Sequence, residues 1–352
     1  MWSSRFSTSF ILHQLMLTSI PNSEQYSAAR NGTVFVRFQQ RGIIRGTGSD
    51  RLDLLHRLST NAVGQLGLGE EATTILSSDK GRIVEVPRVL AFADHLLMIL
   101  VGDDVAGVRA WLDKYTIMDD FATADATPEF AAIGVFGQQA KSQLSAALGT
   151  TPPDAGTYSI SETGTIILRD TRLNGAGAFL LLVPIPQLAS FSNRLAQQSI
   201  PEISVATWQA LRIEAGQPWI GAELSQNYNP LEAGLSQFIS WTKGCYIGQE
   251  IIARLDTYDK VQRHLMGVIL EGFDRSEIET ATELEVHDPV EAKKIGIITS
   301  LAESPGLGKQ IALAYIRTQH AIPGYRVELR SAAQQGGGKP TQGELVNLPF
   351  AL

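Results

Sequence analysis

The order of apolar patterns between residues 131 and 206 constrains the fold of this chain more than any other feature. Strand-like and helix-like segments follow one another there in the order 131–136, 138–148, 165–169, 178–183, 186–198 and 203–205. The dipeptide Asn174-Gly175 marks the turn between two of the strands. The order β-α-β-β-α-β is that of the ferredoxin-like fold, in which the helices cover one face of an antiparallel sheet. Such a fold hosts many activities and does not by itself indicate a function.

The flanking sequence predicts further units, because a chain of 352 residues is too long for a single core. Upstream, an extended segment at residues 33–48 leads into a helix capped by Ser49 or Asp50. Asp103-Asp104 are predicted to open another helix, with their negative charges in its first turn. After residue 260, short strand-like runs alternate with turns and no long helix occurs, which predicts a small β-barrel. Residues 331–343 are polar and glycine-rich, as is typical of a loop or linker.

Composition excludes several classes of protein. The formal charge of −7 leaves no basic field to hold a nucleic-acid backbone. The longest apolar run, residues 178–183, is far shorter than the roughly 20 residues that span a bilayer. A single cysteine rules out an intrachain disulfide and a self-contained thiolate metal site, and the six histidines show no metal-binding spacing. We therefore predict a cytoplasmic protein with no metal site and with neither nucleic-acid nor membrane partners.

The N-terminal segment differs from the rest of the chain in its composition. Its first 23 residues contain no acidic side chain and weakly resemble a transit peptide. A frayed tail, or translation that truly starts at Met16, is the favoured interpretation. Residues 1–25 are accordingly assigned to an N-terminal tail.

One helix holds a carboxylate at an unfavourable position. Thr207 is predicted to cap a helix over residues 208–215, which places Glu214 in its last turn. The helix dipole disfavours a carboxylate there by a few tenths to about 1 kcal/mol. A residue placed against local preference is a mild indication of function. From the residues alone, however, an exposed glutamate paired with Arg212 or Arg263 is the favoured alternative.

The single cysteine lies in the octapeptide KGCYIGQE, residues 243–250. The apolar spacing after Gly248 predicts a helix, so that Cys245 lies just before a helix N-terminus, next to Lys243 and within reach of Arg254. Each of these features favours the thiolate over the thiol. The alternative is a small buried residue, which is the commonest fate of a free cysteine. Surroundings rich in glycine and charge favour the reactive interpretation.

At this point the sequence resembles a known family. The octapeptide around Cys245 is similar to the signature of the YgfZ-type folate-binding proteins, a branch of the glycine-cleavage T-protein (aminomethyltransferase) superfamily. RIEAG at residues 212–216, PLEAGL at residues 230–235 and GIITS at residues 296–300 resemble other motifs of that superfamily. The similarity extends from about residue 26 to residue 329.

The resemblance implies an α+β fold, a T-protein-like cloverleaf of three domains around a channel that binds tetrahydrofolate. We therefore expect a discontinuous folate-binding domain from residues 26–126 and 207–260. Between its two parts lies a ferredoxin-like domain, residues 127–206, and residues 261–352 form the C-terminal β-barrel.

The resemblance also implies the residues of the folate site. Glu214 is expected to hydrogen-bond the pterin, because one carboxylate can accept from two adjacent N–H groups. Trp208 is expected to stack on it, although a role as core anchor of the helix is equally compatible. Arg212 and Gln249 complete the predicted folate-binding set. Arg263 is a further basic residue that would meet the glutamate tail of the folate.

The implied function is assistance to iron–sulfur enzymes. YgfZ-type proteins are linked to tetrahydrofolate-dependent synthesis or repair of iron–sulfur clusters, so client enzymes or assembly factors are the expected partners. Cys245 would act as nucleophile, redox group or transient cluster ligand, tuned by Lys243 and Arg254. Whether the chain is an enzyme stays open.

Two alternatives remain, a folate-dependent aminomethyltransferase and a folate-binding scaffold without chemistry. True aminomethyltransferases carry paired aspartates after a glycine turn. Glu85-Val86 stands at that place here, which makes aminomethyl transfer improbable.

Overall fold

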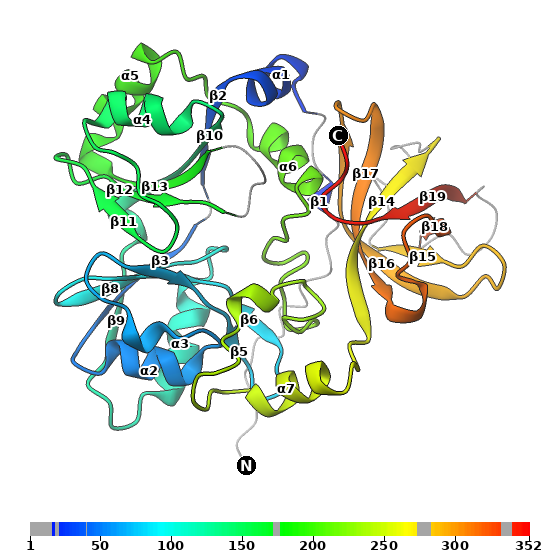
Figure 1. The fold of residues 1–352 in the computed structure, drawn as a ribbon, viewed down its shortest axis with the longest axis horizontal. Coiled ribbons are helices and arrows are strands. Elements are labelled where there is room, and N and C mark those ends of the chain that lie inside the picture. The colour runs from blue at the N-terminus through cyan, green and yellow to red at the C-terminus, as the bar shows by residue number, and fades with distance from the viewer. Residues whose placement is uncertain (1–15, 18–20, 40, 172–176, 273–282, 332–339) are drawn as a thin grey trace.

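The fold is described from a computed structural model, in which residues 16–17, 21–39, 41–171, 177–272, 283–331 and 340–352 are placed. The turn predicted at residues 174–175, most of the loop predicted at residues 331–343 and most of the predicted tail lie outside this part. The described chain forms three lobes (Figure 1). Ser23, Glu24 and Gln25, predicted in the tail, begin helix α1 (Ser23–Asn31).

The first lobe is a five-stranded antiparallel sheet with two helices on one face. Its strand order is β4-β7-β8-β3-β9. The elements are β3 (Ile43–Thr47), α2 (Arg51–Leu58), β4 (Glu71–Thr73), β7 (Arg88–Ala91), β8 (His95–Ile99), α3 (Val105–Tyr115) and β9 (Ala122–Asp125), with a separate ribbon of β5 (Leu76–Ser77) and β6 (Ile83–Glu85). The helix predicted to open at Asp103-Asp104 is confirmed as α3, but Asp104 is its N-cap rather than a residue of its first turn, and its side chain accepts from the backbone N–H of Gly107. Asp50 stands at the N-cap of α2, but its side chain makes no capping hydrogen bond and instead accepts from the backbone N–H of Asp120 at 2.8 Å.

The second lobe is a five-stranded sheet of order β11-β12-β13-β10-β2. It consists of β2 (Thr33–Phe38), β10 (Phe130–Gly137), α4 (Ala140–Leu148), β11 (Tyr158–Ile160), β12 (Ile166–Arg169), β13 (Ala178–Pro184) and α5 (Leu188–Gln197). One apolar cluster joins α4 and α5 to the same face of the sheet, so the ferredoxin-like prediction is confirmed. The prediction of residues 203–205 as the fourth strand is wrong, however. β2 pairs antiparallel with β10 in its place, and residues 201–203 contact β2 through only a single parallel bridge and its backbone bonds.

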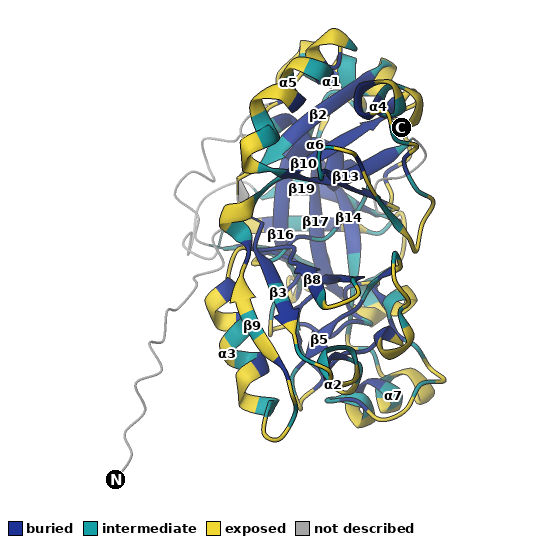
Figure 2. Cartoon of the chain, turned by 90° about the vertical axis from the view of Figure 1, so that its left-hand side faces the viewer, coloured by how far each residue is buried: buried dark blue, intermediate teal, exposed yellow. Residues whose placement is uncertain are grey.

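The first two lobes pack sheet against sheet. Ile43, Leu97 and Ile99 of the first lobe contact Leu168 and Leu180 of the second in one fully buried cluster. The helices therefore lie on the outer faces, and Figure 2 shows their exposed outer surfaces against buried strands. The segments that follow the second lobe in sequence connect these two lobes to the third.

The third lobe is a closed barrel, as predicted. Its strands are β14 (Arg263–Glu271), β15 (Leu284–His287), β16 (Lys294–Ser304), β17 (Lys309–Arg317), β18 (Arg326–Ser331) and β19 (Thr341–Val346). Pairing of β16 with β17 closes the six-stranded ring, and β1 (Met16–Leu17) adds to β16 in parallel. The last strand, β19, was not predicted, because its residues begin inside the polar glycine-rich stretch.

Helix α6 (Val205–Glu214) lies between the second lobe and the barrel (Figure 1). It begins three residues earlier than predicted. Ser204 is its N-cap and accepts from the backbone N–H of Thr207, so Thr207 lies inside the helix. Ala210 and Ile213 pack against Leu313 of the barrel, and α7 (Gln249–Thr257) follows near the first lobe.

Candidate functional site

A cavity of about 670 Å³ is lined by residues from all three lobes. Its walls come mainly from residues 215–218 after α6, residues 233–238, the start of β14 at residues 264–266 and residues 347–349 near the C-terminus. Val86 and Val101 of the first lobe close another side. Small-molecule sites typically have volumes of roughly 300–1,000 Å³, so the cavity is large enough for a cofactor-sized ligand.

The lining of this central cavity is uncharged. Among the described lining residues none is Asp, Glu, Lys or Arg, and His264 is the titratable one. The polar side chains there are Thr171, Gln217, Gln237, His264 and Asn347. A cavity of this kind favours a flat, neutral heterocycle with a few hydrogen-bonding groups over a charged ligand.

Glu214 is buried but does not line the cavity. Its side chain is 1% exposed. One carboxylate oxygen accepts from the hydroxyl of Tyr26 at 2.8 Å and from the hydroxyl of Ser304, and the other pairs with Arg30. The predicted alternative, an exposed glutamate paired with Arg212 or Arg263, is therefore wrong. Arg30, rather than a ligand, offsets the unfavourable helix dipole.

Arg212 lies in the core between α6 and the barrel. Its guanidinium donates to Glu223 at 3.2 Å, to Ser300 at 2.8 Å and to the carbonyl of Gln217 at 3.2 Å. Burial lowers the pKa of Arg212, while the charge of Glu223 opposes the shift. Glu223 in turn accepts from the hydroxyls of Thr299 and Ser300, both at 2.6 Å. Arg212 and Glu214, the two charged residues of the RIEAG motif, are both absent from the described cavity lining.

Trp208 is an anchor of the core. It packs edge-to-face on Trp219, with ring centroids 4.7 Å apart, and on Phe38, 5.0 Å apart. Trp208 is absent from the described cavity lining, and its indole N–H is buried without a hydrogen-bond partner. The placement favours the core-anchor interpretation over stacking on a ligand.

Glu85 stands behind the cavity wall. It is buried, and one carboxylate oxygen accepts from the backbone N–H of Val86 at 2.8 Å and of Val101 at 3.1 Å. Burial raises its pKa, and those backbone donors act against the rise. The two valines line the cavity, whereas the carboxylate of Glu85 contacts their backbone N–H groups and is not part of the described lining.

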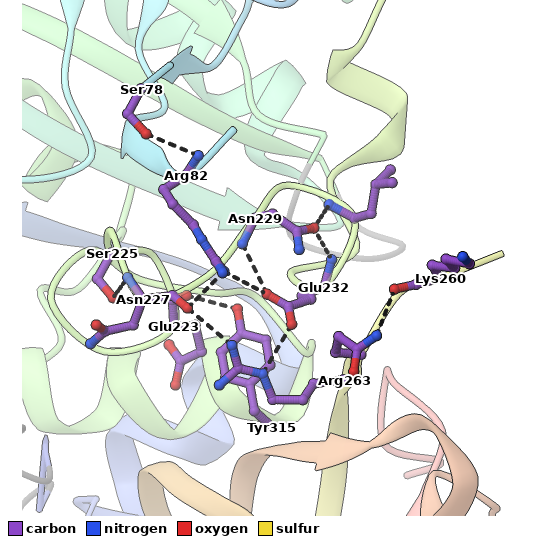
Figure 3. A network of polar contacts seen from close by, with 12 residues as sticks. Ser78, Arg82, Glu223, Ser225, Asn227, Asn229, Glu232, Lys260, Arg263 and Tyr315 are labelled. Atoms are coloured by element: carbon purple, nitrogen blue, oxygen red, sulfur yellow. Dashed lines mark hydrogen bonds and ion pairs between the residues drawn. The ribbon is translucent and has the colours of Figure 1, made fainter. Parts of the chain in front are cut away.

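Glu232, from the PLEAGL motif, connects the lobes (Figure 3). Its carboxylate accepts from Arg263, at the start of the barrel, at 2.9 Å and pairs with Arg82, just before β6, at 3.4 Å. Both arginines also donate to the carbonyl of Asn227. Arg263, which we predicted to meet a folate tail, is therefore already engaged. Tyr228 stacks on Tyr315 beside this network with ring centroids 3.6 Å apart.

The octapeptide loop is attached to the C-terminal end of α2. The ammonium of Lys243 donates to the carbonyls of His56, Ser59 and Asn61, the last two at 2.6 and 3.0 Å. The N–H of Ile247 donates to the carbonyl of Arg57 at 3.3 Å. Helix ends leave such carbonyls without intrahelical partners. The residues two positions before and after Cys245 thus serve as a cap for α2.

Cys245 itself is exposed at the tip of this loop. The predicted helix follows, because α7 begins at Gln249 with Gly248 in a left-handed conformation at its N-cap. A Cβ at Gly248 would lie 2.5 Å from the carbonyl oxygen of Ser78, so only glycine fits this approach to the first lobe. The alternative of a small buried cysteine is wrong.

The predicted partners of Cys245 are placed elsewhere. The ammonium of Lys243 is hydrogen-bonded to a carbonyl at the end of α2, and Arg254 is exposed on α7. Within the described part of the chain, no hydrogen bond or ion pair joins either side chain to Cys245. Gln249, predicted to bind folate, is not among the described cavity residues.

The half-buried position of Lys243 leads to a testable titration. Burial lowers the pKa of its ammonium to about 8. The neutral amine is the reactive form, so trace acetylation of Lys243 in the folded protein should reach half its maximal rate near pH 8. In urea the midpoint should move to about 10.4, the value of an unperturbed lysine. Mass spectrometry of the labelled peptide measures both midpoints, and equal values would contradict the buried placement.

Two residues of this region were missed by sequence reasoning. Glu223 is fully buried, and Gln217 lines the cavity. Gln217 directly follows the RIEAG motif, and that position was the available signal. The two hydroxyl partners of Glu223 lie on β16, more than 70 residues away, so the local sequence could not have indicated its contact with the barrel.

The structure describes neither a metal centre nor a membrane-spanning segment. Among the described residues, no three His, Cys, Asp or Glu side chains are grouped so as to hold a metal ion. None of the helices placed in the structure combines the length and the apolar character needed to cross a bilayer.

Two lobes packed sheet against sheet, a closed barrel, and a cavity with an uncharged described lining between them define a three-lobed α+β protein. The sequence matches the GCVT N-terminal domain over residues 19–243 and the glycine cleavage T-protein C-terminal barrel domain over residues 263–350. The chain belongs to the glycine-cleavage T-protein family.

Individual relatives agree with this assignment. A putative chloroplastic transferase of Arabidopsis thaliana is 30% identical over 312 residues, which cover 87% of this chain and 70% of the relative. An aminomethyltransferase of Symbiobacterium thermophilum is 25% identical over 349 residues, covering 93% and 88%. The crystal structure of glycine cleavage system aminomethyltransferase T from Bartonella henselae superposes with a TM-score of 0.79 at 17% identity, covering 95% of this chain and 91% of that one. The superposition shows a shared fold.

Proposed function

We propose that the protein binds a reduced folate in the central cavity and acts on iron–sulfur client enzymes through Cys245, as a YgfZ-type member of its family. One observation carries the proposal. A neutral, cofactor-sized cavity lies between the RIEAG and PLEAGL segments, and the same chain presents an exposed cysteine on a loop fixed at both sides. The resemblance of the octapeptide to the YgfZ signature supplies the link to iron–sulfur enzymes.

The residues of the cavity fit tetrahydrofolate. The side chains of Leu265, Met266 and Phe238 offer apolar surface to a flat ring, and the buried carboxamide oxygen of Gln217 lacks a partner that a pterin N–H could supply. The charged glutamate tail has no counter-ion on the described lining, so we place it toward solvent. When bound, the cofactor supplies a carrier for a one-carbon unit.

Aminomethyl transfer is the second candidate, since several relatives carry that name. It requires a carboxylate facing the folate. The described cavity lining contains none, and Glu85 is held by backbone donors behind the wall. Robust formation of methylenetetrahydrofolate from an aminomethyl donor would reverse this preference.

Complementation tests the proposal. The gene is expressed in a strain whose iron–sulfur enzymes fail because it lacks its own YgfZ-type protein. Wild type should restore client-enzyme activity, and Cys245→Ala should not, because the reactive sulfur is gone. Thr242→Ala, an exposed change in the same loop, is the matched control and should behave as wild type.

Calorimetry with 5-formyltetrahydrofolate, a stable reduced folate, separates the two parts of the proposal. Cys245→Ala should bind as wild type does, because Cys245 is not among the cavity residues. Full complementation by Cys245→Ala would instead favour a scaffold without chemistry.

A further inference from the structure

Gln217 combines burial, a place in the cavity wall and a missing partner. It is 3% exposed and lines the central cavity. Its carboxamide oxygen is buried without a hydrogen-bond partner, and its side chain makes no hydrogen bond to any other residue that the structure places. Buried polar groups in native proteins are almost always paired, so each unpaired one requires an explanation.

The backbone holds Gln217 in place independently of its side chain. Its N–H donates to the carbonyl of Arg212 at 2.8 Å, and its carbonyl accepts from the guanidinium of Arg212 at 3.2 Å. The preceding Gly216 has a φ of 67°, and a Cβ there would lie 2.7 Å from the Cβ of Leu348. The turn is therefore fixed by Gly216 and Arg212, and the carboxamide is not needed to form it.

Glu214 is already bonded to other side chains, so Gln217 is the residue of this segment that can recognise a ligand in the cavity. The carboxylate of Glu214 is already engaged by Tyr26, Arg30 and Ser304. A neutral carboxamide also suits the uncharged lining better than a carboxylate, which would lose its hydration there. A carboxamide offers both a donor and an acceptor, as does the lactam edge of a pterin.

We propose that Gln217 recognises the ligand of the central cavity by pairing its carboxamide with a lactam or amidine edge of a planar heterocycle. The carboxamide oxygen accepts a ring N–H, and the carboxamide N–H donates to the adjacent ring acceptor. This inference rests on the proposed function, where that heterocycle is the pterin of a reduced folate. It assigns pterin recognition to Gln217 in place of Glu214.

Gln217→Met tests the inference, because methionine keeps the length of the side chain and removes both hydrogen-bonding groups. Calorimetric titration with 5-formyltetrahydrofolate should show affinity weakened roughly tenfold to a hundredfold. Gln197→Met is the matched control, since Gln197 is exposed at the end of α5 and is absent from the described cavity lining, and it should change affinity by less than about threefold.

The unfolding temperature of the ligand-free protein provides a second readout. Removing an unpaired buried oxygen should raise the midpoint of Gln217→Met by about 2–4 °C or leave it unchanged. A group needed for folding would lower it. Weaker binding together with undiminished stability is the combination that a ligand-recognition role predicts.

The possible outcomes distinguish this inference from the proposed function. Wild-type binding with unchanged affinity in Gln217→Met overturns the inference and leaves folate binding intact. A Gln217→Met protein that unfolds or melts earlier shows a structural role and overturns it as well. If wild type does not bind the reduced folate, the proposed function fails, and the assignment of Gln217 to pterin recognition fails with it.

Discussion

Replacing Arg212 with methionine is expected to lower the free energy of unfolding by about 3–5 kcal/mol, the usual cost of leaving one member of a buried ion pair uncompensated. Arg212 and Glu223 are both fully buried, so water cannot replace the lost partner. The change also leaves the carbonyl of Gln217 without its donor. We predicted Arg212 to bind folate, but this variant should fail through instability rather than through selective loss of ligand.

Urea unfolding followed by tryptophan fluorescence measures this effect, since the backbone N–H of Trp219 donates to Glu223 at 2.9 Å. Lys141→Met is the matched control. Its partner Asp154 is 94% exposed, and exposed pairs contribute only about 0–1 kcal/mol. The double variant Arg212→Met, Glu223→Gln should recover part of the loss, because no unpaired charge then remains. A single variant as stable as wild type would contradict the buried pair.

The sequence predicted the elements of the fold better than their partners. Apolar periodicity located most of the helices and strands, because each depends on residues within one or two turns. The pairing of β2 with β10 was not predicted, since about 100 residues separate them. The interval between α5 and α6 was misassigned for a local reason. Residues 203–205 have a strand-like composition, but Ser204 can cap a helix, and the cap determined the structure.

The candidate site shows the same division between local and distant information. The octapeptide correctly indicated a cysteine just before a helix, and the structure shows that this cysteine is exposed. The role of Lys243 was not predictable, because its ammonium bonds to carbonyls at the end of α2, more than 180 residues away in sequence. Glu214 and Arg30 are 184 residues apart in the same way. Nearness along the chain identified the right segments but could not specify which charges meet.

Neutralising Glu232 should loosen the connection between the first lobe and the barrel. In Glu232→Gln, Arg82 and Arg263 lose their shared carboxylate and remain close together on the carbonyl of Asn227. Both arginine side chains are about one third exposed, at 38% and 32%, and keep part of their hydration. We therefore expect a loss of about 2–3 kcal/mol, below the full cost for buried charges.

Hydrogen exchange gives the spatial test of this variant, and the stability loss should be accompanied by faster exchange in residues 227–235 and 258–263. Raising the salt concentration should reduce the loss, because salt screens the repulsion between the two arginines. Glu129→Gln is the matched control. Its partner Arg45 is similarly exposed, but Glu129 is 45% exposed, so this ion pair is an exposed one and its loss should cost no more than about 1 kcal/mol. If Glu232→Gln were as stable as wild type, the lobes would instead be joined mainly by the apolar cluster around stacked Tyr228 and Tyr315.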